Sequence, residues 1–166
     1  RINLSMCTPA EIERGLMDGR LHAGALPMIT PLSTLNYYPL YEEKSSLYCS
    51  HAHPLFDTAE NVDSARLSTA DAVAPGYRMT AETIGLHQQL NCNATATDRE
   101  GIAFLILTGK FVGFLPDHYA TTWLEKHRMR AINPDKMFFT TTIAAATRKG
   151  HRANAILDLF LRSLGL

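Results

Sequence analysis

The sequence has 166 residues, 46% of them hydrophobic and 19% charged, which is typical of a globular protein with one core or with two small cores that share a cleft. Its 16 basic and 16 acidic residues cancel, so the chain lacks the basic surface that binding to nucleic acid requires, and no segment approaches the length of an apolar membrane span. The three cysteines, Cys7, Cys49 and Cys92, form no Cys-x-x-Cys motif and indicate reduced thiols in a cytoplasmic protein.

The first half of the chain predicts a helix between short strands. Ile2–Cys7 alternates between apolar and polar residues with period two, which predicts a strand. Thr8 followed by Pro9 then predicts the start of a helix that ends near Asp18. Further strands are expected over Leu21–Leu26, Leu35–Tyr41, Lys44–Ser50 and residues 73–74, with a polar loop and a short helix near residues 68–72 between the last two.

The second half contains the most informative stretch, an apolar helix that leads directly into a buried strand. Asp98 can cap this helix, and Gly109 can end it in the left-handed conformation. Phe111–Leu115 is short and apolar, as a strand buried on both faces of a parallel sheet should be. Since a helix leading into such a strand is half of a βαβ unit, we expect an α/β fold. The remaining elements expected are helices over Thr80–Leu90, Asp117–Lys126 and Gly150–Leu164, and strands over Cys92–Thr97 and Lys136–Thr147.

Four segments resemble the LysR-type transcriptional regulators. They are Leu16–Ala25, Leu40–Leu55, Glu100–Pro116 and Thr147–Gly150, and they occur in the order and spacing of that family over essentially the whole chain. His22 departs from the pattern, because the family usually has aspartate at this position. Any interaction that the family makes through that carboxylate is therefore in doubt here.

The resemblance implies the effector-binding domain of such a regulator, with a fold similar to type 2 periplasmic binding proteins. In that fold two Rossmann-like subdomains are joined by two crossing strands and hold a ligand in the cleft between them. Subdomain I would comprise residues 1–49 and 143–166, and subdomain II residues 50–142. The winged helix-turn-helix, and the first strand and helix of the effector domain, would precede Arg1.

The same resemblance implies a cytoplasmic sensor that is not an enzyme and uses no cofactor. Its partners would be a small-molecule effector, further copies of itself in a homodimer or tetramer, and DNA only through the preceding domain, with no membrane. A periplasmic solute-binding protein of the same fold is the alternative. An upstream helix-turn-helix or an upstream signal peptide would separate the two.

In folds of this kind, ligands meet the ends of strands, the N-termini of helices and the crossing strands. Arg78 precedes a helix that Thr80 can cap, where free N–H groups and a guanidinium would favour an acidic or strongly polar effector. Each of these residues also has an interpretation without a ligand. Arg78 could simply be solvated, and Asp98 could serve only to cap its helix. The expected ligand-binding residues are Pro27, Met28, Ser50, His51, Tyr77, Arg78, Met79, Thr80, Thr97, Asp98, Thr140 and Thr142.

The main alternative to an effector site is a metal site. Cys49, His51 and His53 alternate, so on a strand they would share one face and, with His22 or Asp57, could bind a metal tetrahedrally. We expect no metal, because the resemblance already accounts for His53-Pro54-Leu55 and the proline should end the strand. A catalytic role is not expected either, since the sequence contains neither a nucleophile motif nor a glycine-rich phosphate loop.

Overall fold

The computed structural model describes residues 2–150 and 155–165, and the chain forms two compact units. Unit 1 is built from the chain up to Glu42 and from Thr141 onward, and unit 2 is Glu43–Thr140. The chain passes from one unit to the other within two long strands, β2 (Leu35–Ser50) and β7 (Phe138–Arg148). The first boundary lies within β2, whose second half is buried in the core of unit 2, and the second boundary lies within β7.

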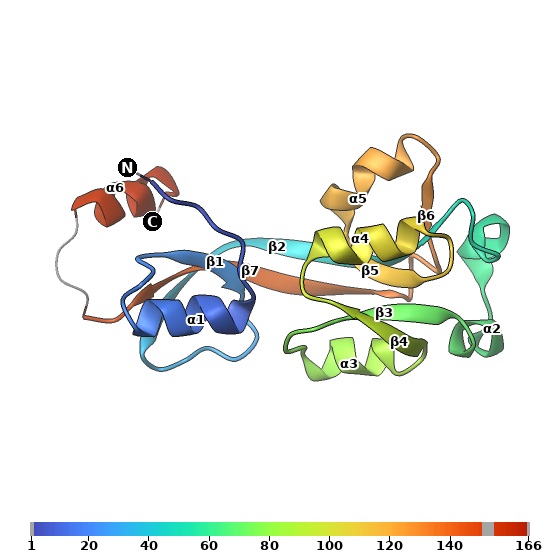
Figure 1. Ribbon diagram of the computed structural model, residues 1–166, viewed down its shortest axis with the longest axis horizontal. Coiled ribbons are helices and arrows are strands. Elements are labelled where there is room, and N and C mark those ends of the chain that lie inside the picture. Colours follow the sequence, from blue (N-terminus) through green and yellow to red (C-terminus); the bar gives the residue numbers. More distant parts are fainter. Residues whose placement is uncertain (1, 151–154, 166) are drawn as a thin grey trace. The chain divides into compact units, whose positions relative to one another are not determined.

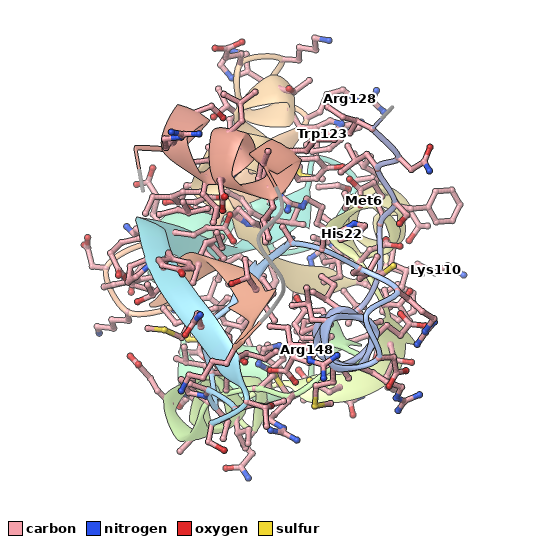
Figure 2. All side chains as sticks on the ribbon, turned by 90° about the vertical axis from the view of Figure 1, so that its left-hand side faces the viewer. Met6, His22, Lys110, Trp123, Arg128 and Arg148 are labelled. Carbon is pink, nitrogen blue, oxygen red and sulfur yellow. The ribbon has the colours of Figure 1, made fainter. Side chains whose placement is uncertain are left out.

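In unit 1, a helix covers a small antiparallel sheet. α1 (Pro9–Met17) begins with a capping box between Thr8 and Glu11, and β1 (Gly24–Pro27) pairs with β7. Both the helix and its cap confirm the prediction from the sequence, although β1 begins three residues later than expected. Arg148 lies beside the end of α1, with its Nη1 4.0 Å from where a Cβ on Gly19 would stand (Figure 2). α6 (Ala155–Ser163) is the last element, and residues 151–154 of the expected C-terminal helix lie outside the described residues.

The prediction of a strand over Ile2–Cys7 is wrong. This segment is not a strand, and the side chains of Ile2 and Leu4 are 85% and 93% exposed. A period-two pattern produces a strand only where a neighbouring strand supplies hydrogen bonds, and within the described residues no strand pairs with this segment. Met6, which projects from the same segment, is 73% exposed (Figure 2).

Unit 2 contains a parallel sheet with helices on both faces (Figure 1). Its strands are β3 (Asp71–Pro75), β4 (Asn91–Ala96) and β5 (Val112–Pro116), which run parallel in the order β5-β3-β4, and β2, which is antiparallel to β5. β6 (Met129–Ala131) pairs with β2. The α/β class predicted from the sequence is therefore confirmed.

Neighbouring residues of the sheet in unit 2 enter two different cores. Tyr48 and Leu115 pack with α4 (Arg99–Leu107) and α5 (Asp117–Leu124), as Figure 1 shows for the helices above the sheet. Leu47 and Phe114 pack on the opposite face, which is covered by α3 (Ala81–His87), α2 (Ser64–Ser68) and the 3-10 helix η1 (Phe56–Asn61). This alternation follows from the strand geometry, in which successive side chains point to opposite faces.

The helix and strand that carried the α/β prediction form as expected. The Asp98 carboxylate accepts a hydrogen bond of 2.7 Å from the backbone N–H of Gly101, and Gly109 ends the helix with a φ of 79°. Two other predictions need correction. Leu35–Tyr41 and Lys44–Ser50 are one continuous strand, and the polar segment from residue 54 to 72 contains η1, α2 and the start of β3 in place of a single short helix near residues 68–72.

Candidate functional site

The end of the parallel sheet in unit 2 brings several predicted site residues together. β3, β4 and β5 end at Pro75, Ala96 and Pro116. Loops lead from β3 and β4 into α3 and α4, whereas α5 begins directly after β5. The backbone N–H of Gly76 donates a hydrogen bond of 2.7 Å to the carbonyl of Ala96, so the loops after β3 and β4 lie side by side. We call this region, residues 76–80, 97–99 and 116–119 together with the start of the unit-2 part of β2, the carboxyl edge.

Two of the predicted residues at the carboxyl edge cap helices. Thr80 accepts a hydrogen bond of 3.1 Å from the N–H of Thr83 and begins α3, and Asp98 begins α4 in the same way. Arg78 lies in the loop before Thr80, and its side chain is exposed. The other predicted residues here are half-buried Tyr77 and Met79 and exposed Thr97. The edge therefore combines two capped helix N-termini with an exposed guanidinium.

Charges of both signs meet around Tyr77. Burial raises the pKa of the Tyr77 phenol, and the nearby carboxylates of Glu43 and Asp98 raise this pKa further, whereas Arg99 lowers it. The Arg99 guanidinium lies 5.7 Å from the centre of the Tyr119 ring at the start of α5. Side chains from β2, the loop after β3, α4 and α5 thus share one electrostatic environment.

A polar network attaches β2 to α5 beside this edge. The Tyr48 hydroxyl donates a hydrogen bond of 2.9 Å to Oδ1 of Asp117, and burial is the main reason that the pKa of Tyr48 is raised. Lys44 Nζ lies 3.9 Å from Oδ2 of Asp117 and 4.5 Å from the centre of the Phe138 ring. These contacts join the part of β2 that lies in unit 2 to the start of α5 and to β7.

Ser50 and His51 do not join this group. β2 runs antiparallel to β5, with Ser45 opposite Pro116 and Tyr48 opposite Gly113, so the end of β2 lies at the amino ends of the parallel strands. Ser50 is fully buried, and its hydroxyl accepts a hydrogen bond of 3.3 Å from the N–H of Ala52. Ser50 and His51 were predicted because they follow this crossing strand, and the antiparallel direction of β2 places them away from the carboxyl edge.

Unit 1 places three further predicted residues together. The N–H of Met28 donates a hydrogen bond of 2.9 Å to the carbonyl of Thr142, and Pro27 pairs with the next residue of β7. The Thr142 hydroxyl donates a hydrogen bond of 2.6 Å to the Glu42 carboxylate. Thr140, two residues earlier on β7, belongs to unit 2 and is exposed.

The residues of the rival metal site are not arranged around a common point. β2 ends at Ser50, so His53 lies in a turn, where its Nδ1 accepts a hydrogen bond of 3.1 Å from the N–H of Leu55. Cys49 points into the core, and burial raises the pKa of its thiol to about 12. Throughout residues 2–150 and 155–165, no three His, Cys, Asp or Glu side chains are grouped so that they could hold a metal ion. In the same residues no helix is long and apolar enough to cross a membrane.

Glu43 is the residue at the carboxyl edge that the sequence reasoning missed. Its side chain is only 11% exposed, and its Oε2 is buried without a hydrogen-bond partner among the described residues. The nearest side-chain nitrogen that could pair with it is Nε2 of His118, at 3.8 Å. One signal could have identified Glu43. It lies four and six residues before Leu47 and Cys49, so it shares their buried face of β2, although it belongs to a run of charged residues.

Comparisons with known proteins agree on one family. The model of the LysR substrate binding domain matches residues 1–165. The HTH-type transcriptional activator BauR of Pseudomonas aeruginosa is 48% identical over 167 residues, and the match covers 100% of this chain and 55% of BauR. The chain thus spans about half the length of this relative.

Solved structures of regulatory domains share the fold. The bromide-bound regulatory domain of HypT from Salmonella typhimurium has a TM-score of 0.73 at 14% identity, and the match covers 96% of this chain and 78% of that one. The CcmR regulatory domain of Synechocystis PCC6803 in complex with 2-PG has a TM-score of 0.73 at 15% identity, covering 93% and 76%. The effector-binding domain of QuiR in complex with shikimate has a TM-score of 0.73 at 12% identity, covering 95% and 77%. The fold expected from the resemblance is thereby confirmed, and the periplasmic alternative is not favoured.

Proposed function

Since the chain belongs to the LysR substrate binding domain family, we propose that it is the effector-sensing domain of a LysR-type transcriptional regulator. Its ligand is a small molecule, as the names of the QuiR and CcmR complexes state for those proteins. Contact with DNA belongs to a separate helix-turn-helix domain, because the 16 basic and 16 acidic residues of this chain leave no net positive charge. The regulator acts in the cytoplasm as a dimer or tetramer.

The effector binds at the carboxyl edge of unit 2. The observation that supports this most is the hydrogen bond between Gly76 and Ala96, which places the exposed Arg78 loop beside the N-terminus of α4. The N–H groups of α4 that the Asp98 cap leaves free, together with the dipole of α4, favour a polar or negative group there, and the Arg78 guanidinium would add a charged hydrogen bond. The effector is therefore acidic or strongly polar. Tyr77, Met79, Thr80, Thr97, Asp98 and Thr140 complete the proposed site in unit 2, and Pro27, Met28 and Thr142 form a second group in unit 1.

A thermal-shift screen of small metabolites tests the sensing function, because a ligand specific to the folded state must raise its apparent stability. A ligand at a hundred times its Kd adds about 2.7 kcal/mol. For a chain of this size that corresponds to an increase in Tm of roughly 5–11 °C. If no metabolite among broad classes of acids, amines and sugars raises the Tm, the sensing function is contradicted.

Arg78→Ala tests the position of the site once a ligand has been found. We expect its affinity by calorimetry to fall by about 1.5–3 kcal/mol, the usual contribution of a charged hydrogen bond. Arg128→Ala is the matched control. Arg128 is also exposed and belongs to unit 2 (Figure 2), but its carbonyl accepts the N–H of His51, at the opposite edge of the sheet. Equal affinities of the two variants would contradict the proposed site while leaving the sensing function intact.

A further inference from the structure

Oε2 of the Glu43 side chain is buried and accepts no hydrogen bond among the described residues. An ionised carboxylate is only an acceptor, and leaving a buried acceptor unpaired costs about 1–3 kcal/mol, more when it is charged. Oε2 of Glu43 is in this state, since the 3.8 Å to Nε2 of His118 exceeds the length of a hydrogen bond. A donor brought by a ligand would remove this penalty.

Two nearby cations of the protein, Lys44 and Arg99, contact other groups. Lys44 contacts Asp117 and the ring of Phe138, on the other face of β2 from Glu43. Arg99 lies over the ring of Tyr119. A cationic ligand group would therefore not compete with an existing strong ion pair for Glu43.

The side chain of Glu43 lies at the border of the buried region. It is 11% exposed, so part of it reaches the surface, whereas Oε2 itself is buried. Tyr77, from the loop that also carries Arg78, lies near enough for the charge of Glu43 to raise the pKa of its phenol. Glu43 thus belongs to the same edge as the proposed site for an acidic group.

We propose that the effector carries a protonated amine or a similar cationic nitrogen group that hydrogen-bonds the Glu43 carboxylate. This inference rests on the proposed sensing function and narrows it to effectors that combine a cationic nitrogen with an acidic or polar group. A charge-assisted hydrogen bond is roughly twice as strong as a neutral one, so the ammonium is preferred over a hydroxyl at the same place.

Four compounds that share a four-carbon chain distinguish the effect of the amine from that of the carboxylate. They are 4-aminobutyrate, 4-hydroxybutyrate, butylamine and 1-butanol. Their binding is measured by calorimetry to the wild-type chain and to Glu43→Gln, which removes the charge at nearly constant volume. Glu60→Gln is the matched control, because Glu60 is an exposed residue of η1 in the same unit. Glu43→Asp keeps the charge and separates its loss from an effect on folding.

In the wild type, we expect each amine to bind more tightly than its alcohol, by at least about tenfold. Glu43→Gln should abolish this difference by weakening the binding of the amines, without weakening the binding of 4-hydroxybutyrate. Glu60→Gln should preserve the difference, and Glu43→Asp should retain part of it. No advantage of amine over alcohol in the wild type, or an equal loss for all compounds in Glu43→Gln, would overturn the inference. Binding of 4-hydroxybutyrate without any amine advantage would refute only the role of Glu43, and the sensing function would stand.

Discussion

Replacing Gly113 by alanine should destabilise unit 2 by overpacking the contact between the sheet and α4. A Cβ at this position would stand 2.6 Å from Cγ1 of Val73, 3.1 Å from Cγ2 of Ile102 and 3.2 Å from Cδ1 of Ile106. Carbon atoms in contact are normally about 3.5–4.0 Å apart, so the nearest contact is too short by roughly 1 Å. All three neighbours are buried and cannot move into solvent.

The net effect is the difference between two terms. Overpacking a core costs about 1–3 kcal/mol, whereas alanine restricts the unfolded chain and recovers about 0.4–1 kcal/mol. We therefore expect Gly113→Ala to lower the free energy of unfolding by about 1–2 kcal/mol. This corresponds to a fall in Tm of roughly 2–8 °C for a chain of this size.

Gly85→Ala is the matched control for this prediction. Gly85 lies in α3, and a Cβ there would meet no atom within 4 Å. Alanine in a helix is favoured over glycine by about 0.8–1.0 kcal/mol, so this variant should be more stable than the wild type. Urea unfolding followed by circular dichroism measures both variants. If Gly113→Ala is as stable as Gly85→Ala, the described packing of α4 on the sheet is wrong.

Three further predictions concern the stability of unit 2 and the function of the chain. Asp98→Ala removes the cap of α4 and should lower the free energy of unfolding by about 0.5–2 kcal/mol in urea titrations, while Asp135→Ala, at an exposed position, should have little effect. Burial lowers the pKa of His87 in the folded state, so the unfolded state binds protons more readily and stability should fall as the pH drops below about 6.5. His87→Phe should weaken this pH dependence in unfolding curves measured between pH 7 and 5, and an unchanged slope would contradict a buried neutral imidazole. The chain alone should not bind duplex DNA, and a shift that persists against competitor DNA at near-physiological salt would contradict its role as a sensing domain only.

The elements that local chemistry determines could be predicted from the sequence. Thr8 and Asp98 cap helices as expected, and Gly109 adopts the left-handed conformation that ends α4, because each depends only on residues a few positions away. The apolar run before Pro116 likewise becomes a buried strand. These features are sufficient to predict the α/β class.

Features that depend on partners distant in the sequence were not predicted. The alternation of Ile2–Cys7 did not produce a strand, because pairing requires a second strand that this pattern cannot reveal. The separation of Ser50 from the carboxyl edge could not be predicted, since the direction of β2 relative to β5 is a property of the sheet. Glu43 was overlooked because it belongs to a run of charged residues, and its proximity to His118 of α5 depends on the tertiary fold.

Hydrogen exchange measured with and without a stabilising ligand tests most directly whether this LysR substrate-binding domain senses its effector at the carboxyl edge of unit 2. The chain is labelled alone and with the best ligand from the metabolite screen, and the protection of each segment is compared. We predict that added protection is concentrated in residues 76–80 and 97–101, where the loops after β3 and β4 lie side by side. Protection concentrated instead at the opposite edge, in residues 50–55 and 127–131, would contradict this location of the site.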